Sequence, residues 1–212
     1  EKKSLIRIKL NPAISPAANA QKYYKDYQKA KNAEHILTEQ IEKGRSELEY
    51  IDSVLDTVSR AESERELAQI REELTEQGYL RKQKGKQRPQ AALPPLEFTS
   101  SDGFKILVGR NNTQNDKLTL KIANKNDMWL HTKDIHGSHT VAFAEGREIS
   151  DTAILEAAQL AAYYSKARES SQVPVDYTLV RYVSKPSGAR PGMVIYVNNK
   201  TVYVTPKANI SE

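Results

Sequence analysis

The feature that most restricts how this chain can fold is a seven-residue repeat that runs from Tyr27 to Val58. Successive positions of the repeat lie three and four residues apart, and only Glu34 and Gly44 interrupt the apolar series. This spacing places one stripe of side chains along a helix and is typical of a coiled coil with charged flanks. The repeat positions are Tyr27, Ala30, Glu34, Leu37, Ile41, Gly44, Leu48, Ile51, Leu55 and Val58.

The helix that carries this stripe is predicted to begin at Pro16. Ser15 can cap the free backbone N–H groups, and proline is tolerated at the first helical position. From Pro16 to Val58 such a helix would be about 65 Å long, which is more than one small domain covers. The stripe therefore needs a partner.

A second, shorter helix is expected over about residues 63–77. After Val58 the repeat loses its register, and Ser59 and Glu62 have the spacing of a capping box. The second helix would span only about 22 Å and cannot cover the whole stripe. The rest of the stripe is expected to meet sequence outside this chain or a second copy of it, and dimerisation would use Leu48, Ile51, Leu55 and Val58.

Charge is divided unevenly along the 212 residues. Up to Gly78 there are 13 Lys and Arg against 15 Asp and Glu, a net charge of −2, whereas the rest carries 19 against 12, a net charge of +7. A basic surface of this kind favours acidic partners, of which RNA is the usual candidate. Because there is no cysteine, no apolar run of transmembrane length and no signal-peptide pattern, we expect a soluble chain in a reducing compartment, with no membrane insertion.

Residues 79–95 form a basic segment without any acidic residue. Two interpretations stay open: a flexible linker, and an arm that contacts phosphate and orders on RNA. The domains expected are therefore a coiled-coil region over 1–78, this basic linker over 79–95 and a second domain over 96–212. The cations of the linker are Arg81, Lys82, Lys84, Lys86 and Arg88.

The second domain has the pattern of strands with two helices, so the predicted fold class is α+β: a long coiled-coil helical segment followed by a mixed, mainly antiparallel sheet. One helix is expected over Asn115–Ala123 and a stronger one from Ser150-Asp151 to about Lys166. Asn198-Asn199-Lys200 separates the last two strands and predicts a hairpin. The strands are expected at Phe104–Val108, Met128–His131, His139–Phe143, Tyr177–Val183, Met193–Val197 and Thr201–Thr205.

A polar cluster at residues 109–112 follows the first of these strands. Arg110 carries a planar fork of donors that suits phosphate or a base edge, and Asn111 and Asn112 each offer a donor and an acceptor. The cluster is therefore a candidate RNA-binding turn. The alternative is a tight polar turn whose asparagines bond their own backbone.

Two further pairs of cations are candidates for phosphate contact. Lys185 and Arg190 lie in a loop fixed by two prolines and two glycines, which is either a rigid phosphate clamp or a plain connection between strands. Lys166 and Arg168 end the stronger helix of the domain, where they would also favour the helix dipole.

The histidines His131, His136 and His139 lie within nine residues, beside Asp127, and invite comparison with a metal site. No His-Glu-x-x-His pattern accompanies them, so we favour hydrogen bonds to the scaffold or to phosphate. Trp129 is expected in the core or stacked on a base. Because nucleophile elbows and nucleotide-binding glycine loops are also missing from the sequence, we expect no catalytic residue, no metal and no cofactor.

Together these motifs resemble the NFACT-R domain, the C-terminal domain of the NFACT family, which includes bacterial fibronectin-binding protein A homologues and RqcH-type ribosome quality-control factors. The resemblance covers about residues 96–206, and the helical region before it is similar to the family's middle coiled coil. It implies that further domains and the outgoing arm precede this chain, whose long helix would be the returning arm. The motifs that carry it are Gly109-Arg110-Asn111-Asn112, Asn115-Asp116, Asp127-x-Trp129-Leu130-His131, Gly137-Ser138-His139, Tyr164-Ser165-Lys166-x-Arg168, Val175-Asp176-Tyr177-Thr178 and Lys185-Pro186-x-Gly188-Ala189-x-Pro191-Gly192.

The resemblance implies a cytoplasmic, ribosome-associated factor that binds the large ribosomal subunit and tRNA and supports C-terminal alanine tailing of stalled nascent chains. The alternative that it implies is a fibronectin-binding adhesin, displayed on the surface of a Gram-positive bacterium without a signal peptide. The expected RNA-binding residues are Arg110, Asn111, Asn112, Asn115, Lys166, Arg168, Lys185 and Arg190. The expected supporting residues of the scaffold are Asp116, Asp127, Trp129, His131 and His139.

Overall fold

The computed structural model of the protein describes residues 6–82 and 92–208. The chain groups into two compact units, Glu1–Leu48 and Glu49–Glu212, and the helix α1 (Pro16–Arg60) runs from the first into the second. The start of α1 is confirmed, because the Ser15 hydroxyl accepts a hydrogen bond from the Ala18 N–H at 3.1 Å. Asn19, which is 3% exposed, fixes the preceding turn by accepting from Asn11 N and donating to Asn11 O.

The second helix, α2 (Glu64–Glu76), is capped by Ser63 and Glu66 and not by the predicted pair. The Ser63 hydroxyl accepts from the Glu66 N–H, and the Glu66 carboxylate accepts from the Glu62 N–H at 2.9 Å. The expected box at Ser59 and Glu62 is wrong because α1 continues to Arg60, and the Ser59 hydroxyl bonds the Asp56 carbonyl within it. The break between the two helices is therefore only three residues long.

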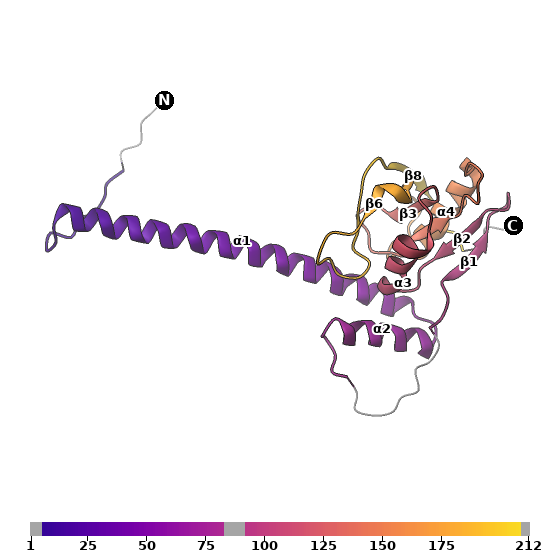
Figure 1. The fold of residues 1–212 in the computed structure, drawn as a ribbon, viewed down its shortest axis with the longest axis horizontal. Coiled ribbons are helices and arrows are strands. Elements are labelled where there is room, and N and C mark those ends of the chain that lie inside the picture. The colour runs from indigo at the N-terminus through magenta and orange to yellow at the C-terminus, as the bar shows by residue number, and fades with distance from the viewer. Residues whose placement is uncertain (1–5, 83–91, 209–212) are drawn as a thin grey trace. The chain divides into compact units, whose positions relative to one another are not determined.

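The last turns of α1 pack along α2, as Figure 1 shows. Tyr50 and Val54 of α1 and Ile70 of α2 form the buried centre of this contact. The side chains proposed for dimerisation lie mostly outside it: Leu48 is 62% exposed, Leu55 64% and Val58 40%, while Ile51 packs at its edge. A second partner for the predicted stripe, whether another segment or another copy, stays a prediction.

The α+β class is confirmed by a six-stranded sheet with the strand order β1-β2-β4-β3-β5-β8. Every strand pair among the described residues is antiparallel, as the prediction of a mainly antiparallel sheet requires. The first strand was missed, because a four-residue edge strand carries little pattern. The strands are β1 (Leu96–Thr99), β2 (Lys105–Val108), β3 (Met128–Thr132), β4 (Thr140–Ala142), β5 (Val173–Leu179) and β8 (Lys200–Val204).

The predicted hairpin across Asn198-Asn199-Lys200 is wrong. Strand β7 (Ile195–Tyr196) pairs with β6 (Val183–Ser184) in a separate two-stranded sheet, whereas β8 pairs with β5. The chain changes sheets at Asn198, whose φ of 55° turns it, and the Thr178 hydroxyl holds this crossing by donating to the Val197 carbonyl at 3.0 Å. A short helical turn, η2 (Val180–Tyr182), interrupts the expected strand Tyr177–Val183.

Both faces of the large sheet are covered by apolar side chains. Helix α4 (Asp151–Tyr163) begins at the predicted Ser150 cap and lays its alanine-rich side on one face, over Ile106, Leu130 and Val175. On the other face, Trp129 and Leu118 belong to a second buried apolar cluster. The expected helix over Asn115–Ala123 is present as α3 (Asn112–Lys117) followed by a π-helical turn, η1 (Leu118–Ile122).

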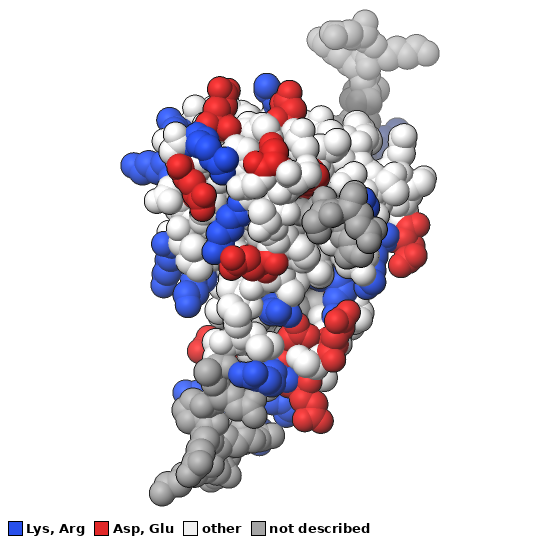
Figure 2. All heavy atoms as spheres, turned by 90° about the vertical axis from the view of Figure 1, so that its right-hand side faces the viewer, with Lys and Arg blue, Asp and Glu red and all other residues white. Residues whose placement is uncertain are grey.

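The basic segment lies only partly within the structure. Arg81 and Lys82 are exposed, whereas Lys84, Lys86 and Arg88 lie outside the described residues. On the face drawn in Figure 2, Lys and Arg are interspersed with Asp and Glu, so no continuous basic patch forms there among the described residues. Within residues 6–82 and 92–208, no helix is both long enough and apolar enough to cross a membrane.

The packing of α2 predicts unequal effects of two substitutions in the same helix. Ile70→Ala removes a side chain that is 4% exposed and should lower the free energy of unfolding by about 2–4 kcal/mol. Leu67→Ala, at a position that is 44% exposed, should lower it by less than about 1 kcal/mol. Denaturant unfolding monitored through α2 amide protection measures both, and equal losses would contradict this packing.

Candidate nucleic-acid interface

The polar turn after β2 is built around a close approach at Gly109. A Cβ atom at this position would lie 2.1 Å from the Asn115 side-chain oxygen and 3.2 Å from the Asn115 N atom. The Gly109 N–H donates to the His139 carbonyl at 3.0 Å, which extends the sheet by one bond beyond β2. Only glycine therefore allows the chain to leave the strand this close to α3.

Arg110 is held inside the protein by three contacts. Its guanidinium forms an ion pair with Glu66 of α2 and donates from Nε to the Pro94 carbonyl at 2.9 Å, and its N–H donates to Gln114 at 3.0 Å. The two charged side chains are 23% and 15% exposed. Burial alone would raise the pKa of Glu66, but hydrogen bonds from the Glu62 N–H and Arg110 outweigh it and lower that pKa below its usual value.

The three predicted asparagines are buried and bonded. Asn111 is the N-cap of α3, where its side chain accepts from the Gln114 N–H at 2.8 Å. The Asn112 amide donates to the Ser53 hydroxyl of α1 at 2.9 Å, and the Asn115 side-chain oxygen accepts from the His139 N–H at 3.0 Å. Only Asn111 therefore fits the alternative of a tight turn whose asparagines bond their own backbone, because Asn112 and Asn115 bond residues outside the turn. Contact of these side chains with RNA stays a prediction that would require these bonds to open.

The loop at residues 185–192 is anchored on the same helices. The Lys185 ammonium pairs with Asp116 and donates to the Arg190 carbonyl at 2.9 Å, and the second Asp116 oxygen accepts from the Gly192 N–H at 3.1 Å. The Arg190 guanidinium donates to Gln77 at 3.0 Å and lies 5.7 Å from the Tyr50 ring centroid. Lys185 and Arg190 therefore fix the loop, whatever else they contact.

Glu73 of α2 is a buried carboxylate that was not predicted from the sequence. Glu73 is 3% exposed and accepts from the Tyr50 hydroxyl at 3.0 Å, from the Thr113 N–H at 2.9 Å and from the Thr113 hydroxyl at 3.0 Å. Burial, and then the nearby Glu73 carboxylate, raise the pKa of Tyr50, which keeps its hydroxyl protonated as the donor. One side chain thereby joins α1, α2 and α3.

Trp129, His131 and His139 form a stacked aromatic group in the scaffold. The Trp129 ring lies parallel to His131, with centroids 5.8 Å apart, and meets His139 edge-on at 5.2 Å. The Gly192 carbonyl can only accept, so His139 donates to it from Nε2 at 3.2 Å and accepts at Nδ1 from the Thr119 hydroxyl at 2.8 Å. This arrangement satisfies a neutral ring, and burial lowers the pKa of both histidines.

Asp127 has a structural role of the same kind. Its two carboxylate oxygens accept from the Asn124 N–H at 2.7 Å and from the Ala144 N–H at 2.9 Å, which ties two loops together. No group of three His, Cys, Asp or Glu side chains within the described part of the chain is placed to hold a metal ion.

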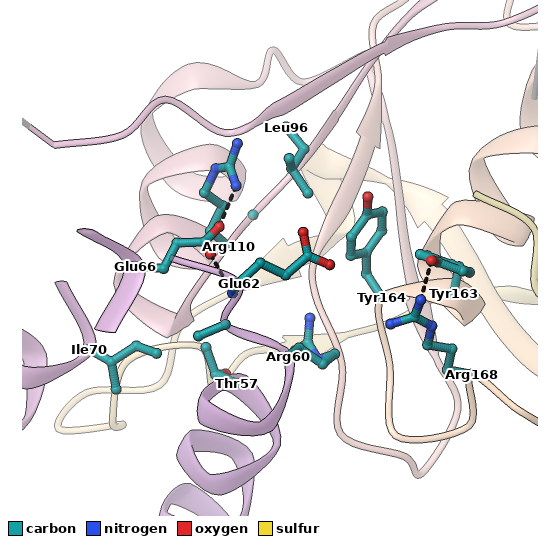
Figure 3. Close-up of a pocket in the computed structure, with 12 residues that line it drawn as sticks. Thr57, Arg60, Glu62, Glu66, Ile70, Leu96, Arg110, Tyr163, Tyr164 and Arg168 are labelled. Atoms are coloured by element: carbon teal, nitrogen blue, oxygen red, sulfur yellow. Dashed lines mark hydrogen bonds and ion pairs between the residues drawn. The ribbon is translucent and has the colours of Figure 1, made fainter. Parts of the chain in front are cut away.

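Lys166 and Arg168 are the two predicted RNA ligands that remain exposed. The Arg168 guanidinium stacks 4.1 Å from the centroid of the Tyr163 ring and bonds its hydroxyl, as Figure 3 shows. Beside them lies a cavity of about 70 Å³, lined by Arg60, Glu62, Glu66 and Arg110 among others. It is well below the roughly 300 Å³ of a usual ligand pocket, so it is too small for a nucleotide.

Two family models match this chain. The model described as the NFACT N-terminal and middle domains matches residues 1–92, and the model described as the NFACT protein RNA binding domain matches residues 95–198. The chain belongs to the NFACT family.

Relatives within this family extend over nearly the whole chain. The Rqc2 homolog RqcH of Bacillus subtilis is 49% identical over 99% of this chain, and that of Streptococcus suis is 45% identical over 95%. The chain spans only 37% and 36% of the length of these two relatives. A solved structure, the C-terminal part of the fibronectin/fibrinogen-binding protein of Streptococcus suis, superposes with a TM-score of 0.84 at 44% identity, over 90% of this chain and 77% of that one.

Three of the predicted RNA ligands connect the two parts of the chain that the two NFACT models match. Arg110, Asn112 and Arg190 belong to the RNA-binding match, yet each bonds a residue of the N-terminal and middle match. Those partners are Glu66, Ser53 and Gln77. These contacts form a junction between the end of α1, α2 and the NFACT RNA-binding domain, which we call the helix junction.

The partners on the helical side of the junction were missed, although two left a signal. Glu66 stands three residues after Ser63, a second capping-box spacing in the same stretch. Glu73 stands three residues after Ile70, on the apolar side of α2, and an acidic residue on such a side commonly has a buried partner. Ser53 and Gln77 left no signal, because polar residues on a charged helix are common.

The lowered pKa of Glu66 predicts how the junction responds to pH. The Glu66–Arg110 pair contributes fully above the ordinary pKa of glutamate, and its contribution is lost as the pH falls through the lowered pKa of the folded state. Glu66→Gln should therefore lower the free energy of unfolding at about pH 7, and this loss should shrink as the pH falls below the ordinary pKa of glutamate.

Denaturant unfolding across this pH range checks the prediction, with Glu64→Gln, an exposed position in the same first turn, as the control. A loss at Glu66→Gln that is the same at every pH would contradict the role of the ion pair.

Proposed function

We propose that this chain is an RNA-binding part of a ribosome-associated quality-control factor. The observation that carries the proposal is the match of residues 95–198 to the NFACT protein RNA binding domain, together with relatives named as RqcH over nearly the whole chain. The net charge of +7 beyond Gly78 agrees with an RNA partner, since phosphate contacts dominate affinity for nucleic acid.

The finer proposal is that the factor works in the cytoplasm on the large ribosomal subunit. There it would bind tRNA and support the addition of C-terminal alanine tails to stalled nascent chains. The chain would contribute position and shape rather than chemistry, because recognition of RNA by backbone contacts needs no reacting side chain. The helix junction supports this role, since it fixes the RNA-binding domain on the last turns of α1 and on α2.

Lys166 and Arg168 are the predicted ligands best placed for phosphate. Both are exposed in the turn that follows α4, which ends at Tyr163 and not at the predicted Lys166, and stacking on Tyr163 orders the Arg168 guanidinium. Arg110 and Arg190 would act mainly through the junction, because their donors already have partners there. Lys185 would act mainly by fixing its own loop, because its ammonium pairs with Asp116.

A second function is favoured by one comparison. The solved structure with a TM-score of 0.84 is that of a fibronectin/fibrinogen-binding protein. The competing proposal is therefore that this chain binds fibronectin at the surface of a bacterial cell. A basic surface binds acidic proteins as well as RNA. The salt dependence of binding distinguishes the two functions only when tRNA and fibronectin are both titrated.

Titration of tRNA across salt concentration tests the RNA proposal. We expect saturable binding whose affinity falls steeply with salt. Lys166→Ala combined with Arg168→Ala should weaken binding and lower the salt slope by about two, because two phosphate contacts are lost. Lys121→Ala combined with Lys207→Ala, which removes two exposed cations elsewhere, is the control.

Fibronectin titrated under the same conditions decides between the two functions. Tight fibronectin binding that persists at high salt, together with no binding of tRNA, would contradict the RNA proposal.

A further inference from the structure

A groove of about 780 Å³ lies on the same side of the sheet as α4. It exists because α4 begins at Asp151 and leaves one end of the sheet uncovered. Tyr177 of β5 and Met128 of β3 belong to the face that packs against α4, yet both line the groove beyond the start of the helix. We call this hollow the α4 groove.

The floor of the α4 groove is apolar and aromatic. Tyr177 and Leu179 lie on the side of β5 that faces α4, and Tyr182 of η2, which is 38% exposed, also lines the groove. Single-stranded nucleic acid binds on surfaces of this kind, because every base has a face that stacks on an aromatic ring. With a volume more than ten times that of the cavity beside Arg110, the groove has room for a nucleotide.

Three cations line the groove and are held in different ways. The Arg181 guanidinium donates from Nε to the Lys125 carbonyl at 3.2 Å and bonds Asn126, so its position is fixed. The Arg147 guanidinium lies 4.1 Å from the centroid of the Phe104 ring. Lys200, at the start of β8, is exposed and forms no ion pair with any described residue.

The groove also has an acidic wall, which restricts what can bind. Glu148 and Asp151 line it from the loop before α4 and from the first residue of α4, and neither forms an ion pair within the described residues. An acidic peptide with negative side chains along its length would place some of them beside these carboxylates. An unpaired nucleotide carries its negative phosphate and its amino-bearing base edge at opposite ends, and carboxylates accept hydrogen bonds from such amino groups.

We propose that the α4 groove binds an unpaired nucleotide of RNA. The base stacks against Tyr177 and Tyr182, the phosphate lies toward Arg181 and Lys200, and the edge of the base faces the acidic wall. The inference rests on the proposed RNA-binding function and adds to it a site that is separate from the helix junction and from Lys166 and Arg168. It also gives the domain a preference for single strands over duplexes, since a paired base cannot enter the groove.

Binding of a short single-stranded oligoribonucleotide to the 212-residue chain, measured by fluorescence anisotropy, tests the proposal. Tyr182→Ala and Lys200→Glu should each weaken binding by about tenfold or more, because one stacks on the base and the other reverses a charge at the phosphate. Lys207→Glu, which reverses an exposed charge beyond the other end of β8, should change affinity by less than about threefold.

A second readout tests the orientation of the base. Glu148→Gln should reduce the preference for adenine-, cytosine- or guanine-containing oligomers over oligouridine, because uracil lacks the amino group that a carboxylate accepts from. A variant that only destabilises the fold should weaken binding of all oligomers alike and leave the base preference unchanged. The same anisotropy assay measures this preference.

The outcomes separate the groove from the proposed function. If the chain binds the oligomer and all three groove variants behave as the unsubstituted chain does, the groove proposal is wrong while RNA binding stands. If the chain binds neither the oligomer nor tRNA, both are wrong. If an acidic peptide binds the chain and loses affinity in the Tyr182→Ala and Lys200→Glu variants, while the oligomer does not depend on these residues, the groove is a protein site and the proposal is overturned.

Discussion

The structure of residues 49–212 depends on one buried carboxylate. Glu73 lies on α2 at 3% exposure and accepts three hydrogen bonds, from the Tyr50 hydroxyl of α1 and from the N–H and hydroxyl of Thr113 in α3. A buried carboxylate is costly unless hydrogen bonds satisfy it, so these donors must be brought together for the unit to be stable. The contacts of Arg110 with Glu66 and of Asn112 with Ser53 lie around this point and complete the junction.

The junction changes how the polar residues after β2 are understood. Residues with the chemistry of RNA ligands hold the RNA-binding domain of this NFACT family member to the adjoining helices, and their donors have partners there. Within the described part of the chain, Lys166 and Arg168 after α4 and the α4 groove at its start are open to a ligand. Both ends of one helix would then be available to the same RNA partner.

The sequence predicted most of the fold, because the signals for the fold are local. The start of α1 at Pro16, the Ser150 cap and the central strands depend on neighbouring residues and were confirmed. The hairpin at Asn198 was wrong because strand pairing is decided by distant partners, here β5 and β6. For the same reason the sequence showed the donors of Arg110 and Arg190 but not Glu66 and Gln77, which lie 44 and 113 residues away.

The most direct test of the account is the free energy of unfolding of Glu73→Gln, compared with Glu72→Gln at the neighbouring exposed position. A glutamine at position 73 would turn an amide donor toward groups that themselves donate. We expect it to lose about 2–4 kcal/mol, with lowered amide protection in α2, whereas Glu72→Gln should stay within about 0.5 kcal/mol of the unsubstituted chain. Equal, small effects of the two substitutions would contradict the claim that this carboxylate holds the helices and the RNA-binding domain together.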